Sequence, residues 1–144
     1  MPTCTFFGHR LCPDAIRPKL REVLVDLIGH HAVDRFYVGC QGSFDRLVRS
    51  VLRELELEYP HIYYAVVLER LPGKQDNNQN QDYSDTMLPE GIERAHPRYA
   101  IAWRNHWMLR QADYVVVYVT HTWGGAAQFA AKAVRQKKIV VNLA

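Results

Sequence analysis

Short apolar runs alternate along the chain with longer segments whose apolar residues recur at helical spacing. The runs lie at residues 3–8, 34–39, 62–68, 114–119 and 139–143. Runs without regular polar alternation are typical of strands buried on both faces, as in a parallel sheet. We therefore predict a parallel sheet of about five strands, with about four helices that cover both of its faces.

Four segments between the apolar runs carry the helical pattern. They are residues 13–31, 44–58, 98–112 and 126–134. Pro18 suits only the start of the first helix, and Pro60 ends the second. The alanines of the fourth favour helix, and the cations Arg135, Lys137 and Lys138 suit the negative end of its dipole.

An α/β domain of three layers follows from this alternation. Right-handed crossovers place the first and fourth strands side by side, which gives the strand order 3-2-1-4-5 of a Rossmann-like sandwich. The 144 residues suit a single domain, residues 1–144. Residues 72–97 interrupt it with a polar insertion, because residues 74–82 are too polar to join a core. We expect a surface insertion, with a flap over a site as the alternative.

Three loops contain the residues that we expect to bind a ligand. In such sheets ligands bind beyond the carboxyl ends of the strands, where the strand order reverses. Glycines at a helix start leave backbone N–H groups free to receive a phosphate, although a tight bend or close packing also demands glycine. The residues are Gly8, His9 and Arg10; Gly39, Gln41, Gly42, Ser43 and Asp45; and Thr120, Trp123, Gly124 and Gly125.

Charged and polar side chains near these loops indicate which groups of a ligand they would bind. Arg10 can hold a phosphate through bidentate bonds. Asp45, at a helix start, either accepts a hydrogen bond from a ribose hydroxyl or only complements the helix dipole. Asn105 lies in the middle of the apolar stripe of its helix, so it pairs with a buried backbone group or contacts the ligand. Arg104 flanks the same stripe and is a further binding residue.

The opposite face of this helix is aromatic. It carries Tyr99, Trp103, His106 and Trp107. Large aromatic side chains gather at association surfaces. We expect the polar insertion or a second subunit to cover them, and we favour a homodimer.

Composition excludes several classes of function. The chain is 48% hydrophobic with a net charge of +3, and it lacks a basic stripe, so we do not expect nucleic acid as a partner. The seven histidines show no metal-binding spacing, and no metal is expected. We expect no signal peptide and no membrane span. Three cysteines without a pairing pattern suggest reduced thiols in a cytoplasmic protein, with Cys40 buried for packing.

Five motifs together resemble the SLOG superfamily, most closely its bacterial YpsA-like branch. They are FFGHR (6–10), FYVGCQGSFD (36–45), LPEGIE (88–93), RYAIAWRNHWML (98–109) and DYVVVYVTHTWGGAAQFA (113–130). The resemblance implies a Rossmann-like domain that binds a nucleotide or a nucleotide-derived, ADP-ribose-like ligand at the glycine loops. The superfamily also includes LOG-type phosphoribohydrolases, whose dimers favour a homodimer here, and the DNA-processing DprA proteins.

The chain departs from the LOG-type enzymes where their catalytic motif, PGGxGTxxE, would lie. Aligned on Gly124 and Gly125, it has Trp123 for the proline, Ala127 for the third glycine, Gln128 for the threonine and Ala131 for the catalytic glutamate. A non-catalytic binding domain is therefore expected. The alternative is a hydrolase that cleaves a nucleotide N-glycosidic bond with another carboxylate, such as Glu69, Asp85 or Glu90.

Overall fold

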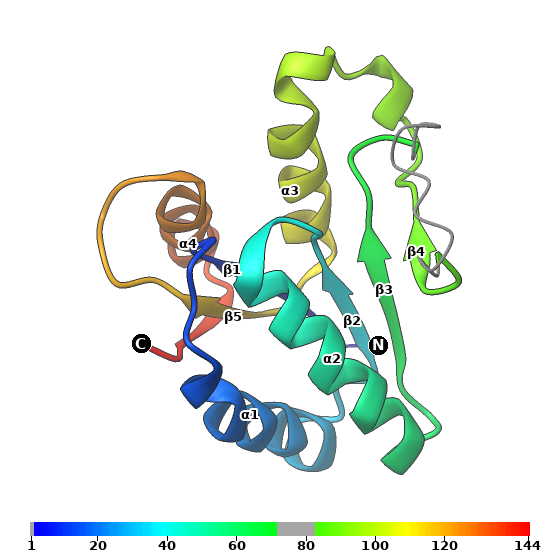
Figure 1. The fold of residues 1–144 in the computed structure, drawn as a ribbon, viewed down its shortest axis with the longest axis vertical. Helices are drawn as coiled ribbons and strands as arrows, with labels where there is room; N and C mark the ends of the chain where they lie inside the picture. Colours follow the sequence, from blue (N-terminus) through cyan, green and yellow to red (C-terminus); the bar gives the residue numbers. More distant parts are fainter. Residues whose placement is uncertain (1, 72–82) are drawn as a thin grey trace.

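The chain forms one parallel sheet covered by helices (Figure 1). The structure, a computed structural model, describes residues 2–71 and 83–144. Its strands are β1 (Thr3–Gly8), β2 (Arg35–Val38), β3 (Tyr63–Val67), β4 (Thr86–Met87), β5 (Tyr114–Tyr118) and β6 (Ile139–Asn142). Its α-helices are α1 (Arg17–His30), α2 (Gly42–Glu58), α3 (Ala100–Gln111) and α4 (Gly125–Arg135). Short 3-10 turns lie at Asp14–Ile16, Ile92–Arg94 and Pro97–Tyr99.

The strand order is β4-β3-β2-β1-β5-β6, and every neighbouring pair is parallel. Without β4, this is the predicted order 3-2-1-4-5, so the Rossmann-like α/β fold is confirmed. The sixth strand comes from the insertion. It pairs with β3 through two hydrogen bonds. The N–H of Val66 donates to the carbonyl of Asp85 over 2.7 Å, and the N–H of Leu68 donates to the carbonyl of Met87 over 2.9 Å. Two-residue strands carry too little pattern to be recognised in a sequence.

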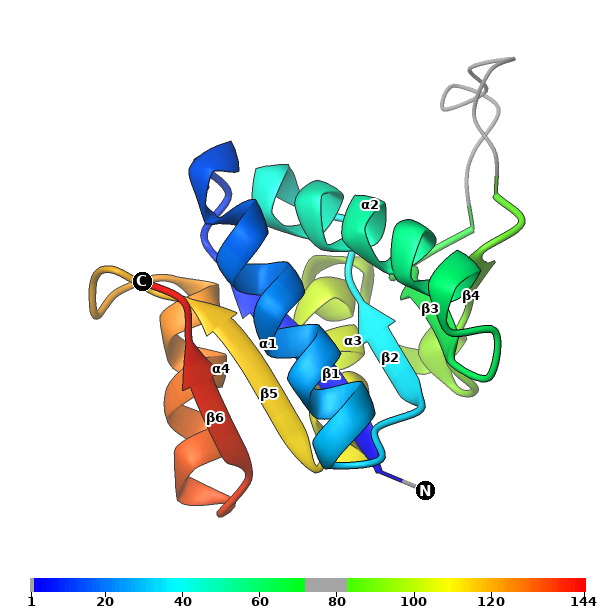
Figure 2. The ribbon, with the colours of Figure 1, turned by 90° about the horizontal axis from the view of Figure 1, so that it is seen from below.

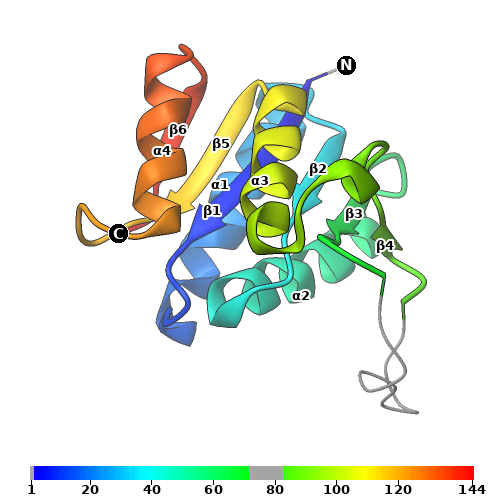
Figure 3. The same cartoon turned by 90° about the horizontal axis from the view of Figure 1, so that it is seen from above.

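Helices cover both faces of the sheet. Figure 2 shows α1 and α2 on one face, and Figure 3 shows α3 on the other, with α4 beside β5 and β6. Two hydrophobic cores fill the layers between helices and sheet. One joins α1 and α2 to the sheet around Phe6, Phe36 and Phe44; the second joins α3 and α4 to it around Phe7, Met108 and Phe129.

The last strand differs from its prediction. Residues 139–143 read as a strand buried on both faces, but β6 is the edge of the sheet and Ile139 is 56% exposed. An apolar run alone cannot distinguish an edge strand from a central one, because only the neighbouring strands decide its burial.

The strand order reverses at β1, which pairs with β2 on one side and β5 on the other. The helices that follow β2 and β5, α2 and α4, therefore start at the same edge of the sheet but on opposite faces. A crevice between them is the expected ligand site of such a sheet. No helix in the described residues is long and apolar enough to cross a membrane.

Candidate functional site

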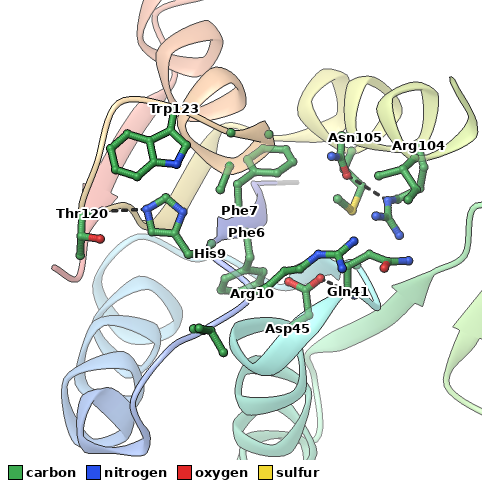
Figure 4. A pocket seen from close by; sticks show the side chains of 18 of the residues that line it. Phe6, Phe7, His9, Arg10, Gln41, Asp45, Arg104, Asn105, Thr120 and Trp123 are labelled. Atoms are coloured by element: carbon green, nitrogen blue, oxygen red, sulfur yellow. Dashed lines mark hydrogen bonds between the residues drawn. The ribbon is translucent and has the colours of Figure 1, made fainter.

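A cavity of about 620 Å³ opens at the carboxyl ends of β1, β2 and β5 (Figure 4). Every binding residue expected from the sequence lines it except Gly42 and Ser43. Seven further residues complete the wall, namely Phe6, Phe7, Leu11, Ile101, Met108, His121 and Ala126. The volume lies in the usual range for small-molecule sites.

The start of α2 is closed by the chain itself. Ser43 donates both its N–H, over 2.7 Å, and its hydroxyl, over 2.6 Å, to the carbonyl of Arg10. The same hydroxyl accepts the N–H of Cys12 over 2.7 Å. Gly42 has φ of 84°, and a Cβ there would lie 2.6 Å from Cα of Arg10. Gly42 and Ser43 thus anchor the β1 loop, and the N–H of Ser43, which was expected to receive a phosphate, already has an acceptor within the chain.

The start of α4 is open. Gly124 caps the helix with φ of 92° and ψ of 170°, a conformation that is essentially restricted to glycine. A Cβ built on Gly124 or Gly125 would meet no atom within 4 Å. Among the described residues nothing accepts the N–H groups of Gly125, Ala126 and Ala127, since the first such bond comes from Gln128. These donors and the helix dipole suit an anion.

The two remaining glycines of the site serve close packing. A Cβ on Gly8 would lie 2.2 Å from the ring of Phe44. One on Gly39 would lie 2.9 Å from the Asp45 carboxylate and 3.2 Å from the Arg104 guanidinium. Gly39 therefore lets these two charged groups approach the floor of the cavity.

Asp45 is a buried carboxylate on the cavity wall. Its Oδ2 accepts the N–H of Gln41 over 2.8 Å. Burial raises its pKa to about 6, although the Gln41 N–H and the positive charge of Arg104 act in the opposite direction. The group therefore changes charge just below neutral pH.

Arg104 is the largest fully buried side chain in the described chain, with 2% exposure. Its Nη1 donates to the Val67 carbonyl over 2.9 Å and lies 3.5 Å from a Glu69 oxygen. Its Nε donates to Asn105 Oδ1 over 2.9 Å. Asn105 therefore pairs with a side chain rather than a backbone group. It also lines the cavity, and its amide nitrogen has no partner in the described residues.

Three rings stack along one wall. His9 lies on His121 and His121 on Trp123, each pair with centroids 3.7 Å apart. The N–H of Thr120 donates to His9 Nε2 over 2.9 Å, so this nitrogen carries no proton. Burial and the neighbouring His121 lower the pKa of His9. Trp123 is 68% exposed at the outer end of the stack.

Sequence reasoning did not include His121. A stack between residues more than a hundred positions apart leaves no signal in one sequence, and only the pairing of β1 with β5 creates it. Arg10, which was expected, lines the cavity with its side chain (Figure 4).

The carboxylates considered for catalysis lie outside this cavity. Asp85 pairs with Arg49 and accepts from Tyr64 Oη over 2.8 Å. Burial alone would raise the pKa of Asp85, but these bonds and arginine charges hold it below its usual value. Glu69 contacts Cys40, Gln41 and Arg104, and Glu90 lies with it along a neighbouring cavity of about 730 Å³. Ala131 is exposed and lines neither cavity.

The aromatic face of α3 is mostly covered by the chain itself. The ring of Trp107 packs edge-on to Tyr37, with centroids 5.1 Å apart. A Cβ on Gly91 would lie 3.4 Å from the Trp103 ring, so the described part of the insertion covers that tryptophan. His106 contacts Phe129. Tyr99 is 60% exposed, so the expected burial does not extend to it within one chain.

Cys40 is exposed rather than buried, which corrects the sequence interpretation. Its Sγ–H donates to Glu69 over 3.2 Å. Partial burial of the sulfur raises the pKa of Cys40 to about 11, against the effect of Arg104, so it is a protonated thiol at neutral pH. No group of three or more His, Cys, Asp or Glu side chains within residues 2–71 and 83–144 is placed to hold a metal ion.

Comparison with known proteins adds one observation. No family model and no curated protein matches the sequence. The fold is similar to that of DNA processing protein A (DprA) from Streptococcus pneumoniae. The TM-score is 0.69 with 16% sequence identity, over 99% of this chain and 50% of that one, so this chain spans half the length of that protein.

At this identity the likeness shows a DprA-like Rossmann fold and no more. It gives no support to the expectation, based on composition, that nucleic acid is not a partner.

Proposed function

We propose that this domain binds a phosphate-bearing nucleotide, or a nucleotide-derived, ADP-ribose-like molecule, in the cavity at the ends of β1 and β5. The observation that carries the proposal is the open start of α4, whose free N–H groups share a cavity with Arg10. Unpaired donors, the helix dipole and a guanidinium together favour a phosphate.

The rest of the cavity supports a nucleoside. The exposed ring of Trp123 ends a stack of planar rings, and a nucleobase can extend such a stack. Asn105, on α3, offers its unpaired amide nitrogen to a base or ribose in the cavity. The proposal includes membership of the YpsA-like branch of the SLOG superfamily, which rests on the five sequence motifs.

Calorimetry against a panel of nucleoside mono- and diphosphates and ADP-ribose tests this function. We expect binding of at least one of them by the wild-type protein. Competition by inorganic phosphate should weaken that binding, because the phosphate group occupies the start of α4. Failure of every member of the panel to bind would reject the proposal.

Hydrolysis of an N-glycosidic bond is the second candidate. Within the described residues Asp45 is the one carboxylate that lines the cavity, and its raised pKa suits proton transfer near neutral pH. Chromatography of nucleoside monophosphates incubated with the protein tests for free base. If the domain only binds its ligand, no free base should appear. Free base that appears with the wild-type protein but not with Asp45→Asn would favour the enzyme.

Nucleic acid and a second copy of the chain are partners that need separate tests. A single-stranded oligonucleotide belongs in the binding panel because of the fold likeness to a DNA processing protein. A homodimer through Tyr99, Trp103 and Trp107 stays a prediction, and Tyr99 is the ring of this face most available to a partner. Sedimentation that shows a monomer at high concentration would reject the dimer. The cytoplasmic location also stays a prediction.

A further inference from the structure

The carboxylate of Asp45 has one oxygen engaged and one free. Oδ2 accepts the N–H of Gln41, whereas Oδ1 has no hydrogen-bond partner among the described residues. The side chain is 8% exposed, and the part that remains open lies on the cavity wall (Figure 4). Oδ1 is not one of the buried, unpaired side-chain atoms of the described residues, so it is open to the cavity. A hydrogen-bond donor on a ligand in the cavity can therefore reach it.

The charges around Asp45 restrict the chemistry of that donor. Arg104 approaches it from α3, and both the Arg104 guanidinium and the Asp45 carboxylate lie next to Gly39. Arg10, from the β1 loop, lines the same cavity (Figure 4). Gln41, from the loop before α2, adds a neutral amide. Two guanidinium groups repel an ammonium group, so a neutral hydroxyl is the better donor.

The position of Asp45 relative to the anion site fits one kind of molecule. Asp45 lies in the first turn of α2, after β2, and the open N–H groups begin α4, after β5. Only β1 separates β2 from β5, so the strands that end at the two sites are two strand spacings apart, about 10 Å within the sheet, and the two helices start on opposite faces of it. Asp45 and the start of α4 line the same cavity, so one molecule that carries ribose hydroxyls and a phosphate can contact both.

We propose that Asp45 accepts hydrogen bonds from the ribose hydroxyls of the ligand, so that the cavity selects ribonucleotides over deoxyribonucleotides. This selectivity rests on the proposed function, because it needs a nucleotide in the cavity. A preference for ribose hydroxyls excludes a DNA strand as the preferred ligand of the cavity.

The test is calorimetry with AMP, GMP, CMP and UMP beside their 2′-deoxy and 3′-deoxy counterparts. The loss of a hydroxyl that donates to a carboxylate lowers affinity by roughly ten- to hundredfold. We expect this preference in the wild type and a loss of most of it in Asp45→Asn. The asparagine keeps the shape of the side chain, and its oxygen still accepts the N–H of Gln41.

Asp113→Asn is the matched control. Asp113 also accepts a backbone N–H, that of Thr3 over 3.0 Å, but it precedes β5 at the opposite edge of the sheet. This variant is expected to keep the full ribose preference. Thermal unfolding of both variants shows that they are folded.

Proton release gives a second readout that does not depend on a variant. Near pH 6 Asp45 is about half protonated, and hydroxyl donors favour its charged form. A ribonucleotide should therefore release more protons on binding than its deoxy counterpart, which carries the same phosphate. Calorimetry in two buffers of different ionisation enthalpy measures the difference.

The outcomes separate the two proposals. Ribonucleotides and deoxyribonucleotides that bind equally tightly, with equal proton release, overturn the role of Asp45 and leave nucleotide binding intact. A wild-type protein that binds no nucleotide of the panel overturns the proposed function and the ribose selectivity with it.

Discussion

Arg104 donates a hydrogen bond from Nη1 to the carbonyl of Val67 over 2.9 Å, which fixes α3 to the carboxyl end of β3. The same nitrogen lies 3.5 Å from the Glu69 carboxylate. A guanidinium with 2% exposure is stable inside a protein only when such partners replace water. Arg104 therefore joins α3, which contributes to the cavity wall, to the end of β3.

Arg104→Met should lower the free energy of unfolding by about 3 kcal/mol, because it leaves the Val67 carbonyl without its donor and the Glu69 carboxylate without the positive charge beside it. Urea denaturation measures the change. Arg110→Met in the same helix is the control, since Arg110 is exposed and its loss should cost less than about 0.5 kcal/mol. Equal losses for the two variants would contradict a structural role for Arg104.

Gly42→Ala tests the closed start of α2. The added Cβ would lie 2.6 Å from Cα of Arg10 at a φ of 84°, so we expect a loss of about 2 kcal/mol or more. Gly29→Ala provides the comparison, because a Cβ there meets nothing within 4 Å in the helix α1. It should stabilise the protein by about 0.5–1 kcal/mol. If the two variants are equally stable, the β1 loop moves to accommodate the added Cβ without a loss of stability.

The starts of α2 and α4, which both contain glycine, show what the sequence alone cannot predict. Both follow a strand and both carry glycine, so the sequence predicts an anion site at each. The alternation of strands and helices was enough to give the strand order, because right-handed crossovers leave few arrangements. The partner that closes α2, the Arg10 carbonyl, comes from another loop, 33 residues away from Ser43. Such a long-range contact leaves no local pattern.

The burial of charged groups was equally invisible. Asp45 was expected at a helix start, but neither its 8% exposure nor its raised pKa follows from that position. Arg104 was expected beside the apolar stripe of its helix, and the structure buries it. In both cases the sheet and a second helix determine the environment, so residue type and spacing alone cannot predict it.

His9 should respond to pH in a defined direction. Its folded pKa lies below 6.5, so the neutral ring is favoured in the folded state. The contribution of His9 to stability is therefore complete above pH 6.5 and decreases as the pH falls through the folded pKa. Protonation also removes the acceptor of the Thr120 N–H and places a charge against His121.

Titration by NMR measures this directly. We expect the His9 ring signals to titrate below pH 6.5 and the Thr120 amide shift to follow the same curve. A His9 that titrates above pH 6.5, or a Thr120 amide that does not follow it, would contradict the hydrogen bond.

Arg10→Ala should weaken nucleotide binding by roughly ten- to hundredfold, because it removes a charge-assisted partner of the phosphate. The Arg10 backbone carbonyl, which closes the start of α2, is unchanged, so stability should differ little from the wild type. Calorimetry measures the affinity. Arg110→Ala removes the same charge from an exposed site outside the cavity and should bind as the wild type does. A similar loss in both variants would indicate a general charge effect instead of a contact.

Gly125→Val tests the anion site at α4. A Cβ at this position would meet no other atom of the described protein within 4 Å, so folding should be preserved. It would nevertheless stand beside the N–H groups that the phosphate must approach, and we expect a loss in affinity of about tenfold or more, which corresponds to about 1.4 kcal/mol. Calorimetry with the nucleotide that the wild type binds best gives the affinity, and thermal unfolding gives the stability.

Gly29→Val is the matched control for this last variant. Gly29 lies in α1, and a Cβ there also meets nothing within 4 Å, so the two substitutions make the same chemical change in similar space. Only the position relative to the cavity differs. If Gly29→Val binds as the wild type does while Gly125→Val does not, the phosphate lies at the start of α4. If both bind normally while Arg10→Ala does not, the phosphate is held by the guanidinium without the helix, and the open N–H groups serve another purpose.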